Sequence, residues 1–440
     1  MALFPSKHAV PAVLVISLVT SSSVFAFRLE SSAGLGLAYT DNATLVPSNQ
    51  IDDWIVSSDL WTHVSKSTGS WQADADLSWE HQVYLNDTYD DRDYVDLSAV
   101  SEWEQMRDRL TWKIEDYFTQ IPIDSLGADT PDNRININIF RFGPNINLPV
   151  SPRHSISLDP YFSDYYYEDN NTDNQQYGLS AGWLYRIYPV MQVGLEGAIN
   201  EVNYSDDLNA DYTSISLHAV VSGTTARSMY AVGLGATDID RKQFSDIDGM
   251  TGDLTWEFKL TGKSRLLATL TSDLTNSSDI FLSSSEDPDS GDFSNVQNSI
   301  DVLRDNLIRL EYRSLIDSNE LVSRFNLRAW IELRDMDYKE TLNDREIQDY
   351  GVEYLYHVSD IFTTGINGRY VKTDSTDIMR EDEEYIFGGT MRYLLSRKLR
   401  CSFDLVYQKR DSTLSTSNYD EYRVFAGLEY AIGRRTPRHW

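Results

Sequence analysis

The chain has 440 residues, enough for two or three ordinary domains or for one large closed β structure. Its 68 Asp and Glu outnumber its 38 Lys and Arg, and a formal net charge of −30 argues against nucleic acid and anionic lipid headgroups as partners. Cys401 is the single cysteine, which excludes an intrachain disulfide, a cysteine-based zinc site and an N-terminal lipid anchor.

The first 26 residues have the pattern of an export signal. Lys7 and His8 form a short basic region, residues 9–19 are mostly apolar, and Val24-Phe-Ala26 places small residues before Phe27. The apolar stretch is about half as long as a membrane-spanning helix requires, so an uncleaved anchor is the less favoured alternative. We expect a cleaved signal peptide over residues 1–26.

The next feature is an alternation that begins clearly at Trp71–Trp79. Its odd-numbered residues are apolar, and the even-numbered residues between them are polar or acidic. Comparable runs cover residues 177–187, 254–260 and 325–333. The strands expected around these runs are about 10 to 14 residues long, which suits a tilted membrane-crossing strand better than an ordinary globular strand. No segment has convincing helical periodicity, so the sequence predicts an all-β protein.

The connections between these runs alternate in length. Short turns are expected near residues 66–69, 107–108, 149–152, 223–226, 262–263 and 396–398. Longer acidic loops are expected at residues 41–52, 86–92, 121–133, 168–174, 204–211, 238–249, 276–298 and 373–382. Short turns at one end and long loops at the other predict a closed antiparallel up-and-down transmembrane β-barrel of about 18–20 strands. The longest loop, 276–298, could fold inward as a constriction or lie outside as a lid.

The same alternation decides which face of each strand is wet. A soluble periplasmic β-sandwich, the alternative fold, would leave long strand edges exposed and would bury many tryptophans in one core. Those tryptophans are Trp71, Trp79, Trp103, Trp112, Trp183, Trp256 and Trp330. A closed barrel in lipid has no edges and turns its apolar face outward. We therefore expect Trp71 to Trp79 to face lipid and Asp74, Asp76 and Glu80 to face a water-filled lumen.

The C-terminal run, residues 422–432, reads as a last lipid-facing strand. Its Gly427-x-x-Tyr430-x-Ile432 pattern resembles the signal that the barrel-assembly machinery reads, although a basic segment follows it. The expected organisation is therefore a barrel over residues 27–433 and a basic periplasmic tail over residues 434–440. The expected location is the outer membrane of a Gram-negative bacterium, with outer-membrane lipid and the barrel-assembly machinery as partners.

Catalytic chemistry has little support in the sequence. The histidines after residue 26 lack metal-pair spacing, and no phosphate loop or nucleophile elbow is present. His81 or His218 could in principle join lumenal carboxylates in a hydrolase site, but isolated strand histidines are the simpler interpretation. We expect no enzyme, no metal and no cofactor.

Charged residues on the expected lumenal face fall into two groups. An acidic wall is predicted from Asp74, Asp76, Glu80, Asp96, Glu102, Glu104 and Glu115. A basic wall is predicted from Arg309, Arg313, Arg324, Arg328, Arg334, Arg369 and Arg392. In a barrel too wide to be filled by side chains, these walls would create a transverse field favouring hydrated polar solutes. The alternative is that a wet lumen simply carries mixed charge.

The first loop carries a resemblance. Tyr39-Thr-Asp41-Asn42, followed by Leu45, Pro47 and the pair Asp52-Asp53, resembles the entry segment of a family of outer-membrane β-barrels. That family is associated with exopolysaccharide export and PEP-CTERM/exosortase systems. The resemblance implies a pore serving polysaccharide secretion, with polysaccharide and a periplasmic export protein as partners. It supplies no catalytic residues, and Asp41 and Asn42 would stabilise the turn leaving the first strand.

These observations rank the possible functions of the chain. The leading prediction is an outer-membrane pore in exopolysaccharide secretion, and the alternative is a general diffusion porin for small polar solutes. A barrel-wall enzyme or a structural adhesin ranks below both, since the sequence shows no site for either.

Overall fold

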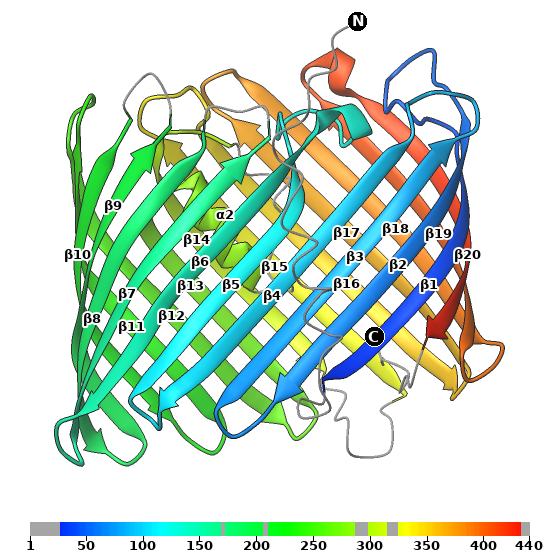
Figure 1. Cartoon of the computed structure of the whole chain (residues 1–440). Helices are drawn as coiled ribbons and strands as arrows, with labels where there is room; N and C mark the ends of the chain where they lie inside the picture. The colour runs from blue at the N-terminus through cyan, green and yellow to red at the C-terminus, as the bar shows by residue number, and fades with distance from the viewer. Residues whose placement is uncertain (1–26, 169–171, 206–209, 287–297, 315–323, 433–440) are drawn as a thin grey trace, which may run out of the picture.

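Twenty antiparallel strands close into one barrel in the computed structural model, which describes residues 27–168, 172–205, 210–286, 298–314 and 324–432 (Figure 1). Strands that are neighbours in sequence pair with each other, and β1 (Arg28–Thr40) pairs with β20 (Tyr419–Ile432) to close the sheet. The predicted fold is confirmed, at the upper end of the predicted strand number. The predicted signal peptide, residues 1–26, and the predicted tail, residues 434–440, lie outside the described residues.

The strands between these two are β2 (Asp53–Ser67), β3 (Trp71–Tyr84), β4 (Arg92–Met106), β5 (Leu110–Pro122), β6 (Arg134–Pro149), β7 (His154–Tyr167), β8 (Asn174–Tyr188), β9 (Met191–Tyr204), β10 (Tyr212–Thr224), β11 (Ser228–Arg241), β12 (Ile247–Thr261), β13 (Ser264–Asn276), β14 (Val302–Ser314), β15 (Phe325–Tyr338), β16 (Arg345–Ser359), β17 (Phe362–Ser375), β18 (Arg380–Leu394) and β19 (Leu399–Ser412).

The two ends of the barrel differ. At the lower end in Figure 1, short turns such as residues 68–70 and 262–263 join the strands, and β1 begins and β20 ends there. At the upper end, the connections include residues 41–52 and 123–133. Barrels of the outer membrane place their short turns in the periplasm and their long loops outside the cell. We call the two ends the short-turn end and the long-loop end.

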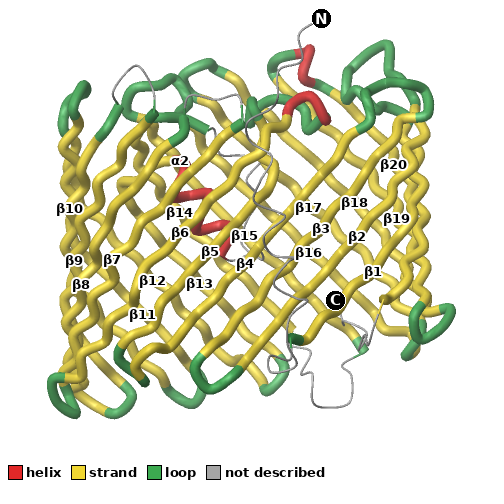
Figure 2. Tube along the Cα trace, in the orientation of Figure 1, coloured by secondary structure: helices red, strands yellow, loops and turns green. Residues whose placement is uncertain are grey.

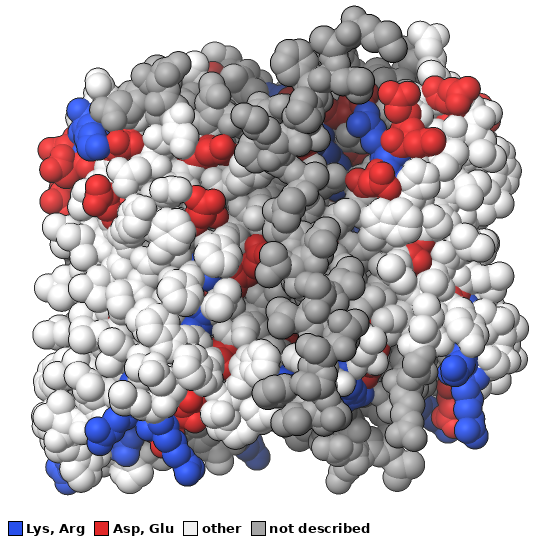
Figure 3. Space-filling model, in the orientation of Figure 1, with Lys and Arg blue, Asp and Glu red and all other residues white. Residues whose placement is uncertain are grey.

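The outer surface is apolar, as a lipid-facing surface requires. Leu35, Leu234 and Ile366 are 66%, 64% and 66% exposed, and the register places all three on the outer face. In Figure 3, charged residues gather toward the two ends of the visible face around a largely uncharged middle. Such a surface is stable in a bilayer rather than in water, because burying apolar area in lipid removes it from water. The barrel therefore lies in the outer membrane of a Gram-negative bacterium, as predicted.

The structure corrects the expected position of one tryptophan, Trp330. It was grouped with the lipid-facing tryptophans, but its register partners are Glu311 and Gly351, and its indole lies over Gly351 inside the barrel. In β15 the apolar outer face is carried by odd-numbered residues, so the even-numbered Trp330 points to the lumen. A side chain at Gly351 would collide with this ring.

A second correction is the helix α2 (Ser277–Glu286), since the sequence predicts no helix. Asn276 caps it: its side-chain carbonyl accepts the backbone N–H of Asp279 at 2.9 Å, and its amide donates to the Asp279 carboxylate at 3.0 Å. The first bond satisfies one of the free backbone donors at the start of the helix, and the second ties the Asp279 carboxylate to the capping side chain. Asn276-Ser-Ser278 resembles turn composition, and a helix of ten residues shows too little periodicity to be recognised. Short 3-10 helices, η2 (Pro131–Asn133) and η4 (Ser415–Ser417), lie in two other loops. No helix within the described ranges is long and apolar enough to cross a membrane.

Candidate channel constriction

The helix α2 lies inside the barrel, near its long-loop end (Figure 2). Ile280, Phe281 and Leu282 are buried, and Phe281 is 1% exposed. They belong to one apolar cluster with side chains from two separate parts of the wall. One part is Tyr117, Ile121, Ile135, Ile137, Ile139, Tyr165 and Tyr167 of β5–β7, and the other is Leu303, Met336, Tyr338, Ile347 and Val371 of β14–β17. The longest loop could fold inward as a constriction or lie outside as a lid, and its helix α2 lies inside the barrel. Its side chains therefore fill a part of the lumen that the sequence predicts to be open.

Hydrogen bonds fix the position of α2 against the wall. Tyr167 Oη lies 2.8 Å from Ser278 Oγ, and Asn174 Nδ2 donates to the same oxygen at 2.9 Å. Tyr165 Oη donates to Asp279 Oδ1 at 3.2 Å. Buried polar groups lose free energy unless they are paired, so these contacts favour one orientation of the helix.

Asp279 makes the docking of α2 dependent on pH. Burial raises the pKa of the Asp279 carboxyl, while hydrogen bonds from Gln176 and Tyr165 and the charge of Arg141 oppose the rise. A carboxyl whose pKa is higher in the docked helix holds its proton better there, so docking strengthens as the pH falls through that pKa. We expect channel conductance to decrease between neutral pH and about pH 4. Asp279→Asn should remove this dependence in single-channel recordings, and an unchanged pH profile in that variant would contradict the assignment.

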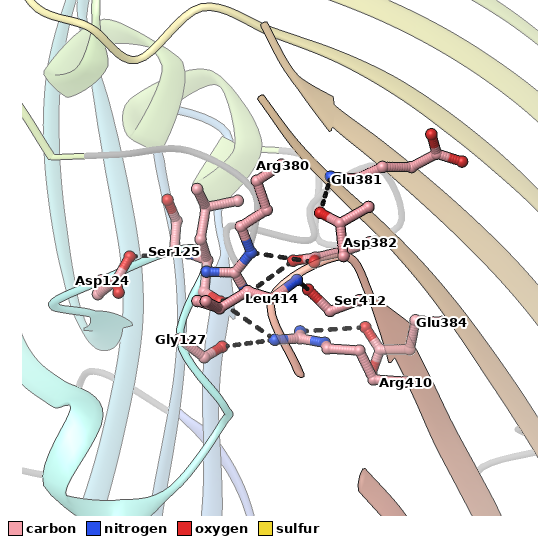
Figure 4. Close-up of polar contacts among 12 residues, drawn as sticks. Asp124, Ser125, Gly127, Arg380, Glu381, Asp382, Glu384, Arg410, Ser412 and Leu414 are labelled. Carbon is pink, nitrogen blue, oxygen red and sulfur yellow. Dashed lines mark hydrogen bonds and ion pairs between the residues drawn. The ribbon is translucent and has the colours of Figure 1, made fainter. Parts of the chain in front are cut away.

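A second inward-reaching element is the β5–β6 loop, residues 123–133, which we call the strap (Figure 4). Arg380 Nη2 of β18 donates to the Leu126 carbonyl at 2.6 Å, and Arg410 Nη1 of β19 donates to the Gly127 carbonyl at 2.9 Å. Strands β18 and β19 lie far from β5 around the barrel, so the strap crosses the long-loop mouth to reach them.

Neighbouring groups hold the strap and its arginines in place. Asp382 lies 2.8 Å from Arg380, and Glu384 lies 3.4 Å from Arg410. Arg345 of β16, only 2% exposed, donates to Ser125 Oγ at 2.7 Å. Guanidinium groups form several directed hydrogen bonds at once, which suits them to gripping backbone carbonyls. Three strands of the far wall thus anchor the strap.

The cavities at the two ends of the barrel differ in size. At the short-turn end, cavities of about 590 and 560 Å³ adjoin the lumen, the second lined by polar side chains that include Gln192, Ser222 and Thr255. At the long-loop end a cavity of about 240 Å³ lies between the strap and the opposite wall. Its lining includes Asp129, Arg134, Leu45, Tyr94 and Arg423. The two cavities at the short-turn end are therefore each larger than the one beside the strap.

The residues of the predicted acidic wall lie on the lumenal face of neighbouring strands. Asp74, Asp76 and Glu80 come from β3, Asp96, Glu102 and Glu104 from β4, and Glu115 from β5. Glu115 pairs with Lys113 at 2.7 Å. Within the described residues, Asp74, Glu80, Asp96, Glu102 and Glu104 form no ion pair with Lys or Arg. This sector carries a real excess of negative charge.

The predicted basic wall has a different character. Arg309, Arg313 and Arg328 surround Glu311, Arg334 pairs with Asp305 at 2.7 Å, and Arg369 pairs with Asp349 at 2.9 Å. Arg392 also faces the lumen, and Arg324 is exposed just before β15. The arginines alternate with carboxylates that share their face, because adjacent strands bring acidic positions opposite them. We call this the ion-paired sector, since its charges largely cancel.

Arg334 and Asp305 provide a stability test of the ion-paired sector. Their side chains are 14% and 12% exposed and form two parallel hydrogen bonds of 2.7 and 2.8 Å. We expect Arg334→Ala to lower the free energy of unfolding by about 2 kcal/mol, because it leaves a mostly buried carboxylate unpaired. The double variant Arg334→Leu with Asp305→Leu should lower the free energy of unfolding by less than Arg334→Ala does, because it leaves no unpaired charge. The measurement is urea unfolding in detergent followed by tryptophan fluorescence, with exposed Arg324→Ala as the neutral control.

The entry segment that carries the family resemblance has a structural role. Asn42 is completely buried: its amide donates to the Val46 and Asp420 carbonyls at 2.9 Å each, and its carbonyl accepts the Val46 N–H at 3.2 Å. Asp41 Oδ1 accepts the Tyr422 N–H at 2.8 Å. Tyr39 packs on Trp54 with ring centroids 5.0 Å apart, and Pro47 is exposed. The segment fastens the first loop to β20 where the barrel closes.

The two histidines named as possible hydrolase residues, His81 and His218, lie on opposite faces of the barrel wall. His218 faces the lumen, with Nε2 2.8 Å from Thr251 Oγ1. His81 points outward beside Asp93, at 3.0 Å, because it occupies an odd position in β3. The suggestion that His81 could join lumenal carboxylates is therefore wrong. His63, which the sequence did not single out, lies between Asp74 and Asp76; counting back from the turn at residues 68–70 would have placed it opposite them.

Comparisons with known proteins agree with a porin-like barrel. Residues 347–431, from β16 to β20, match the model of a family described as "Putative beta-barrel porin 2". The chain is a porin-like barrel of the outer membrane. Similar solved structures include the siderophore receptor PirA from Pseudomonas aeruginosa (11% identity, TM-score 0.45, 92% of this chain and 80% of that one). Another is P. aeruginosa OccK2 (OpdF) in complex with glucuronate (10%, TM-score 0.40, 92% and 98%). No curated protein matches the chain.

Proposed function

We propose that this porin-like barrel is a channel for small hydrophilic solutes, narrowed at its long-loop end by α2 and the strap. The observation that carries the proposal is the position of α2, which fills part of a polar lumen and shares one buried apolar cluster with residues of β5–β7 and of β14–β17. A water-filled lumen with an inward-folded loop admits small solutes and rejects large ones by size.

The chemistry of the remaining lumen suits polar solutes. The acidic sector on β3 and β4 attracts cations, and the ion-paired sector across the barrel offers many hydrogen-bond donors and acceptors. Small and hydroxylated residues such as Ser216, Thr255 and Thr269 line part of the wall between them. Neutral sugars and small cations fit such a surface better than apolar molecules do.

Liposome swelling tests this proposal with the full mature chain. We expect fast swelling with monosaccharides, slow swelling with disaccharides and little with longer oligosaccharides. Equal rates for all sizes would show that α2 and the strap do not narrow the path. No swelling with any solute, despite heat-modifiable mobility that proves a folded barrel, would show a closed barrel and overturn the proposal.

A second candidate is a role in exopolysaccharide secretion, favoured by the entry segment from Tyr39 to Asp53. Under this proposal α2 and the strap would leave the lumen when a polymer passes, driven by a periplasmic export partner at the short-turn end. Passage of a chain wider than a single sugar requires such a movement, since α2 packs on both walls.

A deletion strain distinguishes the two candidates. Loss of secreted polysaccharide with accumulation of polymer in the periplasm would support the secretion role. Unchanged polysaccharide in both fractions, together with lost uptake of small sugars, would leave the diffusion channel alone.

A further inference from the structure

The hairpin β2–β3 brings one imidazole and two carboxylates together on the lumenal face. His63 is the register partner of Asp76, and Asp74 is the preceding lumen-facing residue of β3. His63 Nδ1 lies 3.2 Å from Asp76 Oδ2, and Nε2 lies 3.6 Å from Asp74 Oδ2. One ligand atom from each residue lies within 4.8 Å of the others. We propose that His63, Asp74 and Asp76 bind one divalent transition-metal ion of the Zn²⁺ class.

The arrangement of the imidazole is the main argument for a cation. A neutral imidazole carries one N–H, yet both ring nitrogens of His63 face carboxylates. A second ring proton would let an imidazolium donate to both carboxylates, whereas in the neutral ring one carboxylate meets a nitrogen lone pair, which is repulsive. A metal ion on that nitrogen removes the repulsion and is shared with the carboxylate oxygens. The ring stacks on Trp61 at 6.1 Å and 6°, and its side chain is 13% exposed, so its plane is held in place.

The donors select the class of metal. One nitrogen and two carboxylate oxygens suit Zn²⁺, Cu²⁺, Ni²⁺ or Co²⁺, whereas Ca²⁺ and Mg²⁺ prefer oxygen ligands alone. Three protein ligands leave room for water at a fourth position, as in an open zinc site. Among these metals Cu²⁺ should bind most tightly.

The surroundings give access and a favourable field. The cavity of about 590 Å³ at the short-turn end is lined by Asp74, Ser65, Gln72 and Glu102, so ions reach the site from the periplasmic mouth. Arg28 lines the same cavity, but it pairs with Glu30. Nearby Glu80 and Glu102 add negative charge that concentrates cations. A bound ion neutralises part of the acidic sector and so lowers the cation selectivity of the channel.

Metal titration of the folded, detergent-solubilised barrel tests the site without requiring any current. We expect one Cu²⁺ per chain, with coupling to one imidazole nitrogen in the electron paramagnetic resonance spectrum. His63→Gln should weaken binding by at least about tenfold and abolish that nitrogen coupling. The matched control is His81→Gln, which removes a histidine 3.0 Å from a single carboxylate on the outer surface.

The outcomes separate the proposal from its competitors. Asp74→Asn with Asp76→Asn keeps the imidazole and should also weaken binding, which a lone surface histidine would not show. No stoichiometric Cu²⁺ binding by the wild type, or equal binding in His63→Gln, would overturn the site. Heat-modifiable mobility confirms that each variant is folded. The result is independent of whether the barrel conducts solutes.

Discussion

Releasing α2 from the barrel wall should raise single-channel conductance severalfold. The variant Ile280→Ser with Phe281→Ser removes two buried apolar side chains from the cluster that α2 shares with β5–β7 and β14–β17. Large buried side chains contribute about 3 kcal/mol or more each, so the helix should leave its position. No strand residue is changed, and the strand pairing that closes the barrel is retained. A barrel of this strand number without an inward helix encloses a wide aqueous channel.

The control for this experiment lies on the same helix. Ser283 is exposed, and its hydroxyl donates to the Ile280 carbonyl of the same helix at 2.9 Å. Ser283→Ala should therefore conduct like the wild type. If the double variant is folded and also conducts like the wild type, α2 is not the constriction, and the narrow point must lie elsewhere along the lumen.

Neutralising the acidic sector should remove most of the cation selectivity of the channel. Glu80→Gln, Asp96→Asn and Glu102→Gln change three lumenal carboxylates that form no ion pair with Lys or Arg within the described part of the chain. The opposite, ion-paired sector contributes little net charge, so no other group compensates for the loss. We expect the reversal potential in a KCl gradient to move from a cation-selective value toward zero.

Two controls test whether the lumenal carboxylates set the selectivity. One raises the salt concentration, and the other removes carboxylates from the outer face. The Debye length is about 10 Å at 0.1 M salt and about 3 Å at 1 M, so wild-type selectivity should itself decline at high salt. Asp93→Asn, Asp116→Asn and Asp164→Asn remove as many carboxylates from the outer face of the strands, and should leave the reversal potential unchanged. An equal shift in both triple variants would mean that net protein charge, rather than the lumenal sector, sets selectivity.

The barrel could be predicted from sequence because its signal is repeated many times. Trp71–Trp79 alternates so regularly that one face must meet lipid, and the alternation of short and long connections fixes which end each loop occupies. The lumenal position of Asp74, Arg328 and their neighbours follows from parity within a strand. Trp330 shows that residue type alone can mislead, since its aromatic character suggests the outer face while its parity within β15 correctly places it in the lumen.

The constriction could not be predicted, because it depends on contacts between distant segments. Nothing local in Ser277–Glu286 indicates that Phe281 lies beside Tyr167 in a cluster that also contains Met336. The strap depends on Arg380 and Arg410, which lie more than 250 residues along the chain from Leu126 and Gly127. The sequence predicts a basic wall from its arginines alone. It does not reveal the carboxylates that strand pairing brings beside them. Cross-strand register, rather than residue type, decides whether such charges cancel.

Polymer exclusion measured separately from each side of a planar bilayer tests the central claim most directly. The account predicts that polyethylene glycols of larger size enter and lower the current from the short-turn side, where cavities of about 590 and 560 Å³ adjoin the lumen. Only smaller polymers should do so from the long-loop side, where α2 and the strap narrow the path and the adjacent cavity is about 240 Å³. Equal cut-off sizes from the two sides, or a smaller cut-off from the short-turn side, would contradict a constriction at the long-loop end.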